Sequence, residues 1–279
     1  MRSKVYTIAE IGINHNGTLG VAEELIKVAA AAGFDAVKFQ KRTPELCVPK
    51  HKRDEIRATP WGDITYMEYK QEIEFGVEEY DEIDELCKHY CIAWSASPWD
   101  LDSLSFLTQY SLPWVKIPSA LITDLKLVRR ASRFFNKVII STGMSTLEEV
   151  DAAYEEILKH GTGRVVVMHC NSEYPTPVEN INLNCLTTLK ERYPEATIGY
   201  SGHEYGLTTT IASVALGARM IERHVTLDKT MWGTDHMCSV EPHGMFKLIR
   251  GIDDMSKALG DGKKRITEGE ELKKRDLRP

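Results

Sequence analysis

Charged side chains interrupt several short apolar segments of the chain. Lys38 and Lys116 each lie within an otherwise apolar run, and Glu10 and Glu222 lie near the ends of two further strand-like runs. An ionised group that is removed from water costs free energy unless it is paired or serves a function. Two interpretations of the lysines therefore stay open, namely buried ion pairs with Glu10 or Glu222, and a pocket that binds an anion.

Small hydroxyl residues at the ends of other apolar segments favour the anion pocket. Ser141 begins the sequence STG, and Ser201 begins the sequence SG. Both lie where a strand is expected to turn into a helix, and the N–H groups of helix N-termini bind phosphate. Two lysines together with such turns suit a phosphate or a phosphorylated carboxylate. Further apolar segments also end in polar residues, namely Gln40, Ser97, Ser119 and His169.

Two histidines end consecutive apolar segments, so that they can face each other. These are His203 and His224, and two imidazoles with open coordination positions can hold a divalent transition metal. Because no local HxxxH pattern is present, general acid–base catalysis and structural hydrogen bonding remain alternatives. His169 is more ambiguous. Asp235 follows in the glycine-containing sequence MWGTDH, where it can act as a base or as a partner of another site residue.

The elements that must position these residues alternate in a regular order. Strands are expected at residues 5–12, 36–40, 92–97, 114–119, 138–142, 165–170, 197–201 and 220–226. Helices are expected at residues 19–32, 77–90, 101–110, 124–134, 147–160, 181–193, 207–216 and 242–259. Strands that alternate with helices indicate βα units and a parallel sheet, and eight such units close a (β/α)₈ TIM barrel of the α/β class. The rival doubly wound sheet usually carries a GxGxxG turn, which this sequence lacks.

We expect one domain, with a barrel over residues 1–262 and a charged C-terminal tail over residues 263–279 that runs along its outside. The connection over residues 41–76 is too long for a plain turn, and long connections in compact domains are usually functional. We expect it to pass over the barrel mouth. In barrel enzymes the active site lies at the carboxyl ends of the strands, where the polar residues above would meet.

Two groups of loop residues keep two interpretations each. His15 lies in the turn sequence NHNG, where it serves the loop itself or contacts a substrate. Trp61, Tyr66 and Tyr69 in the long connection are either aromatic residues of a lid or a small satellite core.

Composition excludes some classes of protein. The chain has 279 residues and a net charge of −6, without a basic patch that would indicate nucleic acid binding. No apolar run approaches the roughly 18 residues of a membrane helix. The six cysteines are scattered without a CxxC pair, which favours reduced thiols and a cytoplasmic location.

Seven ordered motifs together resemble the sialic acid synthase family, also called the N-acetylneuraminate synthase or NeuB family. They are IAEIGINHNG (8–17), VKFQ (37–40), VKIPSA (115–120), STGMST (141–146), HCNSEYPTP (169–177), GYSGH (199–203) and IERHVTLDKTMWGTDHMCSVEP (221–242). The resemblance implies a metal-dependent condensation of phosphoenolpyruvate with an open-chain aldose similar to N-acetylmannosamine. The products would be phosphate and a nine-carbon 2-keto-3-deoxy sugar acid.

The resemblance also implies roles for individual residues. Glu10 would lie near the reacting carbons, and Asp235 and Lys116 would complete the catalytic set. His203 and His224 would bind a divalent metal, usually Mn²⁺. Substrate contacts are expected from Lys38, Gln40, Ser97, Ser119, Ser141, Ser172, Tyr174 and Ser201, with Gln40 and Tyr174 on the sugar side.

Departures from the family pattern fall on the sugar side. We expect a short form without the C-terminal antifreeze-like domain of many members, which leaves the N-acetyl contact and the arrangement of the expected homodimer open. A related synthase that uses another or a phosphorylated aldose is the alternative, in which Lys50, Lys52 and Arg53 could bind a second phosphate. Solvated surface charges are the other explanation for these three. A non-catalytic barrel that binds a sugar acid is the alternative from a different class.

Overall fold

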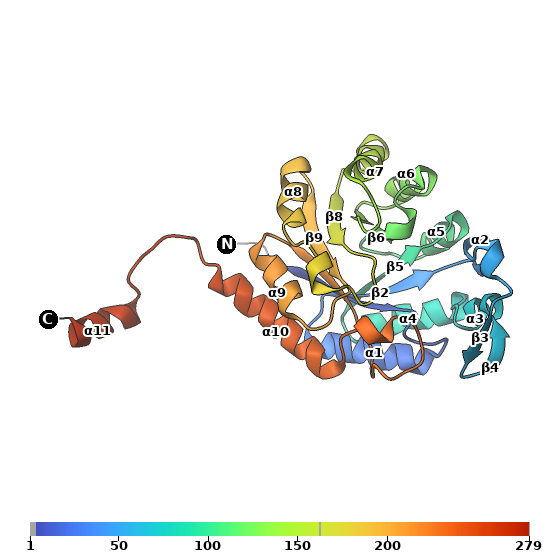
Figure 1. Ribbon diagram of the computed structural model, residues 1–279, viewed down its shortest axis with the longest axis horizontal. Coiled ribbons are helices and arrows are strands. Elements are labelled where there is room, and N and C mark those ends of the chain that lie inside the picture. Colours follow the sequence, from blue (N-terminus) through green and yellow to red (C-terminus); the bar gives the residue numbers. More distant parts are fainter. Residues whose placement is uncertain (1–3, 162, 279) are drawn as a thin grey trace.

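The computed structural model describes residues 4–161 and 163–278 and has the predicted (β/α)₈ barrel architecture. Parallel strands follow one another around the barrel in the order β5-β2-β1-β10-β9-β8-β7-β6, with helices on the outside (Figure 1). The strands are β1 (Tyr6–Gly12), β2 (Ala36–Lys41), β5 (Ala93–Pro98), β6 (Val115–Ile117), β7 (Val138–Ser141), β8 (Val165–Cys170), β9 (Thr197–Gly202) and β10 (Met220–His224). Strands β5 and β6 close the ring without a ladder, and the Ser95 hydroxyl donates a hydrogen bond of 2.5 Å to the Trp114 carbonyl there.

The outer helices begin and end close to the predicted positions. They are α1 (Leu19–Ala32), α4 (Val77–His89), α5 (Leu101–Leu107), α6 (Leu125–Phe134), α7 (Leu147–His160), α8 (Cys185–Arg192), α9 (Thr208–Ala215) and α10 (Pro242–Ala258). Helix α7 shows why the sequence fixes such limits. The Thr146 side chain accepts from the Glu149 N–H while the Glu149 side chain accepts from the Thr146 N–H, which is a capping box.

The barrel interior has an apolar layer below a polar one. The inner apolar cluster consists of Ile8, Ala36, Trp114, Ile139, Val166, Met168 and Met220. Several of these lie two residues before a polar residue of the same strand: Ile8 before Glu10, Ala36 before Lys38, Trp114 before Lys116, Ile139 before Ser141 and Met220 before Glu222. Side chains two residues apart point to the same face of a strand. The polar residues therefore form the next layer, at the carboxyl ends of the strands.

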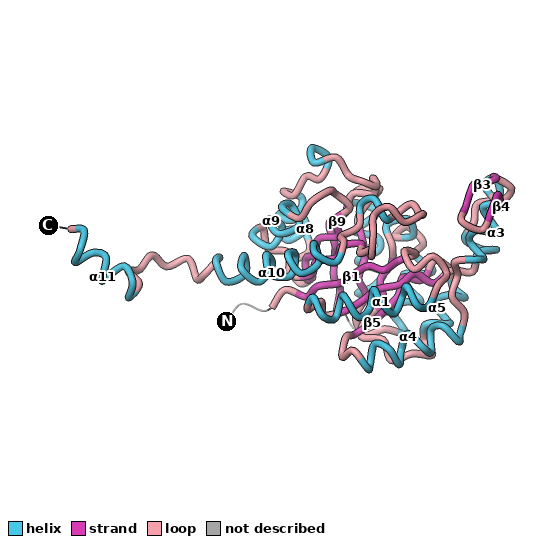
Figure 2. Tube along the Cα trace, turned by 90° about the horizontal axis from the view of Figure 1, so that it is seen from below, coloured by secondary structure: helices cyan, strands magenta, loops and turns pink. Residues whose placement is uncertain are grey.

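Residues 41–76 fold into their own small unit at the barrel rim, which we call the excursion. It contains α2 (Pro44–Cys47), the 3₁₀ turn η1 (Lys50–Lys52), the antiparallel hairpin β3 (Ile56–Thr59) and β4 (Gly62–Thr65), and α3 (Tyr66–Glu72). Figure 2 shows the hairpin and α3 at the opposite end of the molecule from α11. The Lys41 ammonium, 2.6 Å from a Glu74 carboxylate oxygen, joins the two ends of the excursion. Tyr69 and Ile73 pack with Ile13 in a satellite core, with Tyr66 and Trp232 against it.

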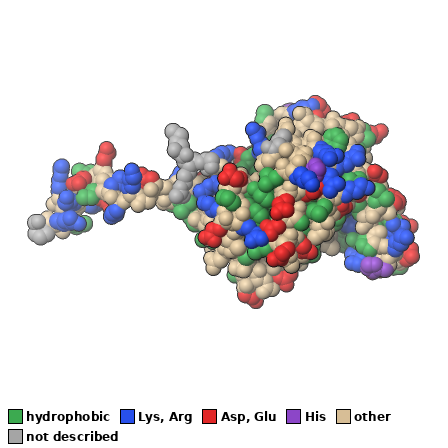
Figure 3. All heavy atoms as spheres, turned by 90° about the horizontal axis from the view of Figure 1, so that it is seen from above, with side chains coloured by type: hydrophobic (Ala, Val, Ile, Leu, Met, Phe, Trp, Pro, Cys, Tyr) green, Lys and Arg blue, Asp and Glu red, His purple; other side chains and the backbone are tan. Residues whose placement is uncertain are grey.

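The C-terminal tail leaves the barrel instead of covering it. Every described residue from 263 to 278 is exposed, and α11 (Glu268–Leu277) stands apart from the barrel (Figure 1). Figure 3 shows this arm with acidic and basic side chains along it. The expectation that the tail runs over the barrel surface is therefore wrong for residues 263–278. No helix within residues 4–161 and 163–278 is long and apolar enough to cross a membrane.

Candidate active site

The predicted polar strand ends share one cavity at the carboxyl end of the barrel. Its volume is about 190 Å³. Of the predicted site residues, Glu10, Lys38, Gln40, Ser97, Lys116, Ser119, Ser141, Ser172, Tyr174, Ser201, His203 and His224 line it. The remaining one, Asp235, lies next to the cavity beside His224, 3.8 Å from its Nδ1 atom. The fold thus brings every predicted site residue to one place.

The register of the strands sets the neighbours of Glu10. Strand β1 lies between β2 and β10, so that Glu10 pairs with Lys38 on one side and with His224 on the other. On the next ladder, Glu222 pairs with Ser201. Because paired residues of parallel strands lie side by side, the charges and the imidazole meet on neighbouring strands. The β1–β2 ladder is irregular only beyond this point, between Glu10 and Gly12.

Two buried lysines and two buried glutamates form a charge quartet on the cavity wall. The Lys38 ammonium lies 2.7 Å from Glu10 and 4.0 Å from Glu222, and the Lys116 ammonium lies 2.5 Å from Glu222. Lys38 also donates to the Ser97 hydroxyl at 3.1 Å. The ion pairs that the sequence left open are therefore present, and the same lysines face a cavity. The two interpretations coexist.

The two glutamates of the quartet differ in acidity. Burial raises the pKa of Glu10, although Lys38 opposes the rise. Burial acts in the same direction on Glu222, but Lys116 and Lys38 together outweigh it and lower the pKa of Glu222 to about 2. Glu222 is thus a permanent counter-ion of the lysines. Glu10, which accepts a 2.9 Å hydrogen bond from the Gln40 amide, is the carboxylate better suited to exchange a proton.

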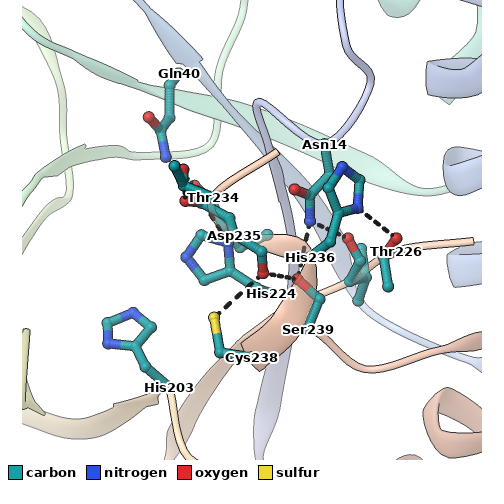
Figure 4. A network of polar contacts seen from close by, with 12 residues as sticks. Asn14, Gln40, His203, His224, Thr226, Thr234, Asp235, His236, Cys238 and Ser239 are labelled. Atoms are coloured by element: carbon teal, nitrogen blue, oxygen red, sulfur yellow. Dashed lines mark hydrogen bonds and ion pairs between the residues drawn. The ribbon is translucent and has the colours of Figure 1, made fainter. Parts of the chain in front are cut away.

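The two predicted metal ligands lie next to each other in the cavity, with ring centroids 5.3 Å apart (Figure 4). Nδ1 of His203 lies 2.6 Å from the Asn171 carbonyl oxygen. Because a carbonyl only accepts, Nδ1 carries a proton, and Nε2 is the nitrogen that would bind a metal. Burial lowers the pKa of His224 to about 3, which keeps this imidazole neutral. Tyr174 stacks on His203 with the ring centroids 4.0 Å apart.

The donor set fits a divalent metal with open coordination positions. The buried Nδ1 atom of His224 has no hydrogen-bond partner among the described residues. An imidazole binds a metal through a deprotonated ring nitrogen, and a carboxylate nearby suits a hard ion such as Mn²⁺. Residues 4–161 and 163–278 contain no ready-made cluster of three or more His, Cys, Asp or Glu ligands. Substrate or water would therefore complete the coordination of an ion held by His203 and His224.

Asp235 lies in a loop whose hydrogen bonds mostly join residues of the same loop (Figure 4). The Ser239 hydroxyl donates to the Asp235 carbonyl at 2.6 Å, and the Thr234 hydroxyl donates to its carboxylate at 2.7 Å. The Asn14 amide anchors this loop by donating to Ser239 at 2.9 Å and to the Val225 carbonyl at 2.8 Å. Asn14 is thus a positioning residue of the NHNG turn that the sequence did not single out.

Two other histidines lie outside the lining of the catalytic cavity. His15 is buried and stacks on Phe75 with the ring centroids 3.9 Å apart, away from the cavity lining. His169 donates from Nε2 to the Ile181 carbonyl at 2.6 Å. The alternative in which His15 contacts a substrate therefore has no support in the geometry.

Several residues that line the cavity were not predicted to belong to the site, including Glu222, Trp99 and Cys170, although Glu222 was expected as a possible ion-pair partner of the lysines. For Glu222 a signal existed, because it lies two residues before His224 on one strand and must share its face. A larger cavity of about 680 Å³ adjoins the site between α7 and α8 and shares Met144, Cys170 and Ser172 with it, but it does not contain the charge quartet.

Comparison with known proteins agrees with the geometry. The chain matches the NeuB family over residues 25–264. It is 37% identical to N,N'-diacetyllegionaminic acid synthase of Campylobacter jejuni over 272 residues, which are 96% of this chain and 81% of the relative. It is 38% identical to N-acetylneuraminate-9-phosphate synthase of Drosophila melanogaster, over 89% of this chain and 67% of that one. The crystal structure of an N-acetylneuraminic acid synthetase from Leptospira borgpetersenii in complex with citrate superimposes with a TM-score of 0.87 at 31% identity, covering 99% of this chain and 93% of that one.

Proposed function

This chain belongs to the NeuB family, and from that membership we propose that it condenses phosphoenolpyruvate with an open-chain aldose similar to N-acetylmannosamine. The products are phosphate and a sialic-acid-type 2-keto-3-deoxy sugar acid. The observation that carries the proposal is the single cavity in which the buried charge quartet and the His203–His224 pair meet. One half suits an anionic substrate, and the other half suits the activation of a carbonyl.

The lysine half of the cavity binds phosphoenolpyruvate in this proposal. Lys38 and Lys116 provide charge for the phosphate and the carboxylate, and Ser141 and Ser201 provide hydroxyl donors. Ser201 already accepts from the Lys116 ammonium at 3.4 Å. The ion pair with Glu222 holds Lys116 in place before the substrate enters. Little side-chain entropy is therefore lost when phosphoenolpyruvate binds.

The histidine half binds the acceptor aldose. Gln40, Tyr174 and Asp235 surround the place where its aldehyde would lie, and His203 and His224 would hold the metal, which we propose to be Mn²⁺. When bound, the ion supplies Lewis acidity that makes an aldehyde carbon more electrophilic. Ser239 donates to the Asp235 carbonyl and Thr234 donates to the Asp235 carboxylate. These hydrogen bonds keep the carboxylate fixed beside this position.

Glu10 serves the step after carbon–carbon bond formation. Attack of the enol C3 on the aldehyde carbon leaves positive charge at C2 of the phosphoenolpyruvate portion, and the aldehyde oxygen takes up a proton. The Glu10 carboxylate stabilises that charge and accepts a proton from the water that adds to C2. The resulting adduct carries a hydroxyl and a phosphate on one carbon, and it expels phosphate to leave the 2-keto group.

The test is phosphate release from phosphoenolpyruvate in the presence of Mn²⁺ and a panel of aldoses, with the product identified by its mass. We expect release that depends on the aldose and a product with the mass of the condensed sugar acid. Release with phosphorylated aldoses alone would favour the related synthase. Absence of release with every aldose would contradict the proposal and favour a barrel that only binds a sugar acid.

The metal assignment has its own test, which does not depend on activity. We expect His224→Ala to weaken Mn²⁺ binding by more than about 100-fold, since even an outer partner of a ligand contributes roughly 10- to 100-fold. The measurement is the electron paramagnetic resonance signal of free Mn²⁺ in a titration. The exposed His243 on α10 provides the matched control, because His243→Ala should bind the ion normally. Equal binding by all three proteins would refute the assignment.

A further inference from the structure

A second cavity, of about 430 Å³, opens beside Asp235. It is lined by Arg57, Ala58, Tyr69, Trp232, Gly233 and Thr234. One wall is the excursion and the other is the loop after β10, and the Trp232 indole joins them by donating to the Ala58 carbonyl at 3.1 Å. Gly233 and Thr234 immediately precede Asp235. The cavity therefore begins on the side of the catalytic cavity that we assign to the acceptor.

Three cations of the excursion lie on aromatic rings in this region. The Lys70 ammonium is 4.8 Å from the ring centroid of Tyr69 and 5.4 Å from that of Tyr66. The Arg57 guanidinium is 4.2 Å from the centroid of the same Tyr66 ring. The Arg42 guanidinium is 4.2 Å from the ring centroid of Trp99, which lines the catalytic cavity. Ring faces attract cations without neutralising them.

Two of these cations have no anionic partner among the described residues, and the third, Arg57, has one distant partner. Within residues 4–161 and 163–278, the Lys70 ammonium donates no hydrogen bond and forms no ion pair, and it lies on the Tyr69 and Tyr66 rings. Arg42 donates from Nη2 to the Gln40 side chain, but its buried Nη1 has no hydrogen-bond partner among those residues. Arg57 faces Glu55 only at 3.7 Å.

The carboxylates nearby are already engaged. Glu74 lies 2.6 Å from the Lys41 ammonium, and Asp235 accepts from Thr234 and faces His224. Burial, and then the charge of Arg42, lower the pKa of Lys70 to about 7 although Asp235 opposes the change. Burial is thus the larger cause, and repulsion between the Lys70 and Arg42 charges adds to it. An added dianion would relieve this repulsion.

We infer that Lys70, Arg57 and Arg42 form a subsite for a phosphate ester at the end of the acceptor aldose remote from its aldehyde. The inference rests on the proposed function, which places the aldehyde beside Asp235. A phosphate carries charge close to −2 and three acceptor oxygens, which suits several cations better than a neutral acyl group does. The cations that the sequence suggested for a second phosphate do not fit, because Lys50 and Lys52 are exposed and Arg53 donates to the carbonyls of Glu45 and Val48.

The experiment compares N-acetylmannosamine 6-phosphate with N-acetylmannosamine as acceptors. We expect a kcat/KM at least about tenfold higher for the phosphorylated acceptor, as one charge-assisted contact provides. Lys70→Gln should lower the ratio of the two values by about tenfold or more. Lys70→Arg should keep most of it. Lys52→Gln, an exposed lysine of the same excursion, is the matched control and should leave the ratio unchanged.

Binding of both sugars to the complex with phosphoenolpyruvate, measured by calorimetry, completes the test. Equal use of the two acceptors, or a ratio that Lys70→Gln leaves intact, would overturn the subsite while the proposed function stands. If neither sugar supports phosphate release, the proposed function fails for these acceptors. The subsite would then be supported by binding of the phosphorylated sugar that weakens in Lys70→Gln, and overturned by equal binding of the two sugars.

Discussion

The two glutamates of the charge quartet have pKa values shifted in opposite directions, and their surroundings explain the difference. Glu222 lies near both lysines, at 2.5 Å from Lys116 and 4.0 Å from Lys38. Glu10 has one lysine partner, and burial raises its pKa. When two carboxyl groups are driven apart in acidity, the one with the raised pKa is the candidate acid–base group. This assigns proton transfer to Glu10 and charge balance to Glu222.

Glu10→Gln tests that division of roles. The amide keeps the size of the side chain and one of its two acceptor oxygens but can neither accept a proton nor balance developing charge. We expect turnover to fall by about 10²- to 10⁴-fold, measured as phosphate release. Phosphoenolpyruvate should still bind in calorimetry, because Lys38 and Lys116 remain. Full activity of the variant would remove Glu10 from the mechanism.

His15 provides a pH test of the fold. Burial lowers its pKa from 6.5 to about 3, and the charge of Arg42 adds to this. The unfolded chain therefore binds a proton more readily between these two values, so that stability is fully present above pH 6.5 and is lost as the pH falls towards 3. From pH 6.5 to pH 5 this one group should lower the free energy of unfolding by about 2 kcal/mol, at about 1.4 kcal/mol per unit.

The measurement is urea unfolding at several pH values for the wild type and for His15→Phe. Phenylalanine keeps a ring against Phe75 and does not titrate. We expect the difference in unfolding free energy between the two proteins to change by about 2 kcal/mol over this range. A difference that stays constant with pH would show that folding does not change the pKa of His15.

At the scale of residues, the sequence could identify the groups at strand ends and could not identify those on the excursion. Lys38, Lys116 and His224 stand in apolar strands, where a charged or polar side chain is a local signal. Lys70 and Arg57 lie in a polar segment, where charges are ordinary. Only the packing of the excursion against Trp232 gives them a common environment, and no short-range pattern records that contact.

At the scale of elements, the alternation of strands and helices was sufficient for the barrel, and the errors fall where local rules compete. Helix α8 was predicted from residue 181 but begins at Cys185, because the preceding segment forms a 3₁₀ turn, η3 (Val178–Asn180), and Asn182 has a φ of 50°. The hairpin of β3 and β4 was missed altogether. Its strands have four residues each, too few to show a period.

The Trp232 contact holds the excursion against the loop of Asp235, so Trp232→Phe tests the role of this element. The substitution keeps an aromatic ring but removes the donor to Ala58. Loss of one such hydrogen bond should lower the free energy of unfolding by about 1 kcal/mol. We also expect a higher KM for the acceptor with an unchanged KM for phosphoenolpyruvate, measured in steady-state kinetics.

Trp61→Phe is the matched control for this substitution. Trp61 belongs to the same excursion, meets the Trp232 ring edge to face at 5.9 Å and is 41% exposed. Trp61→Phe should change neither the KM for the acceptor nor the KM for phosphoenolpyruvate. If both variants raise the acceptor KM equally, the aromatic surface as a whole matters and the hydrogen bond does not.

At the scale of the whole molecule, the barrel separates stability from chemistry. The inner apolar layer and the much larger core between strands and helices bury hydrophobic side chains below the polar layer. Their burial offsets the cost of placing four ionised groups and two imidazoles in the interior. Period-two alternation in the strands made this division predictable, since a polar residue at a strand end shares the face of the apolar residue two positions before it.

The tail belongs neither to the apolar core nor to the polar layer. Its removal tests whether it contributes to the stability of the barrel. Every described residue from 263 to 278 is exposed, so a chain that ends at residue 262 should unfold within about 1 °C of the full chain. A chain that ends at residue 250 loses the buried Ile252 of α10 and should unfold at a clearly lower temperature. Light scattering on both shortened chains tests the predicted homodimer at the same time. A lower unfolding temperature together with a lower mass for the chain ending at 262 would show that α11 binds a second copy, because every described residue of the tail is exposed in the single chain.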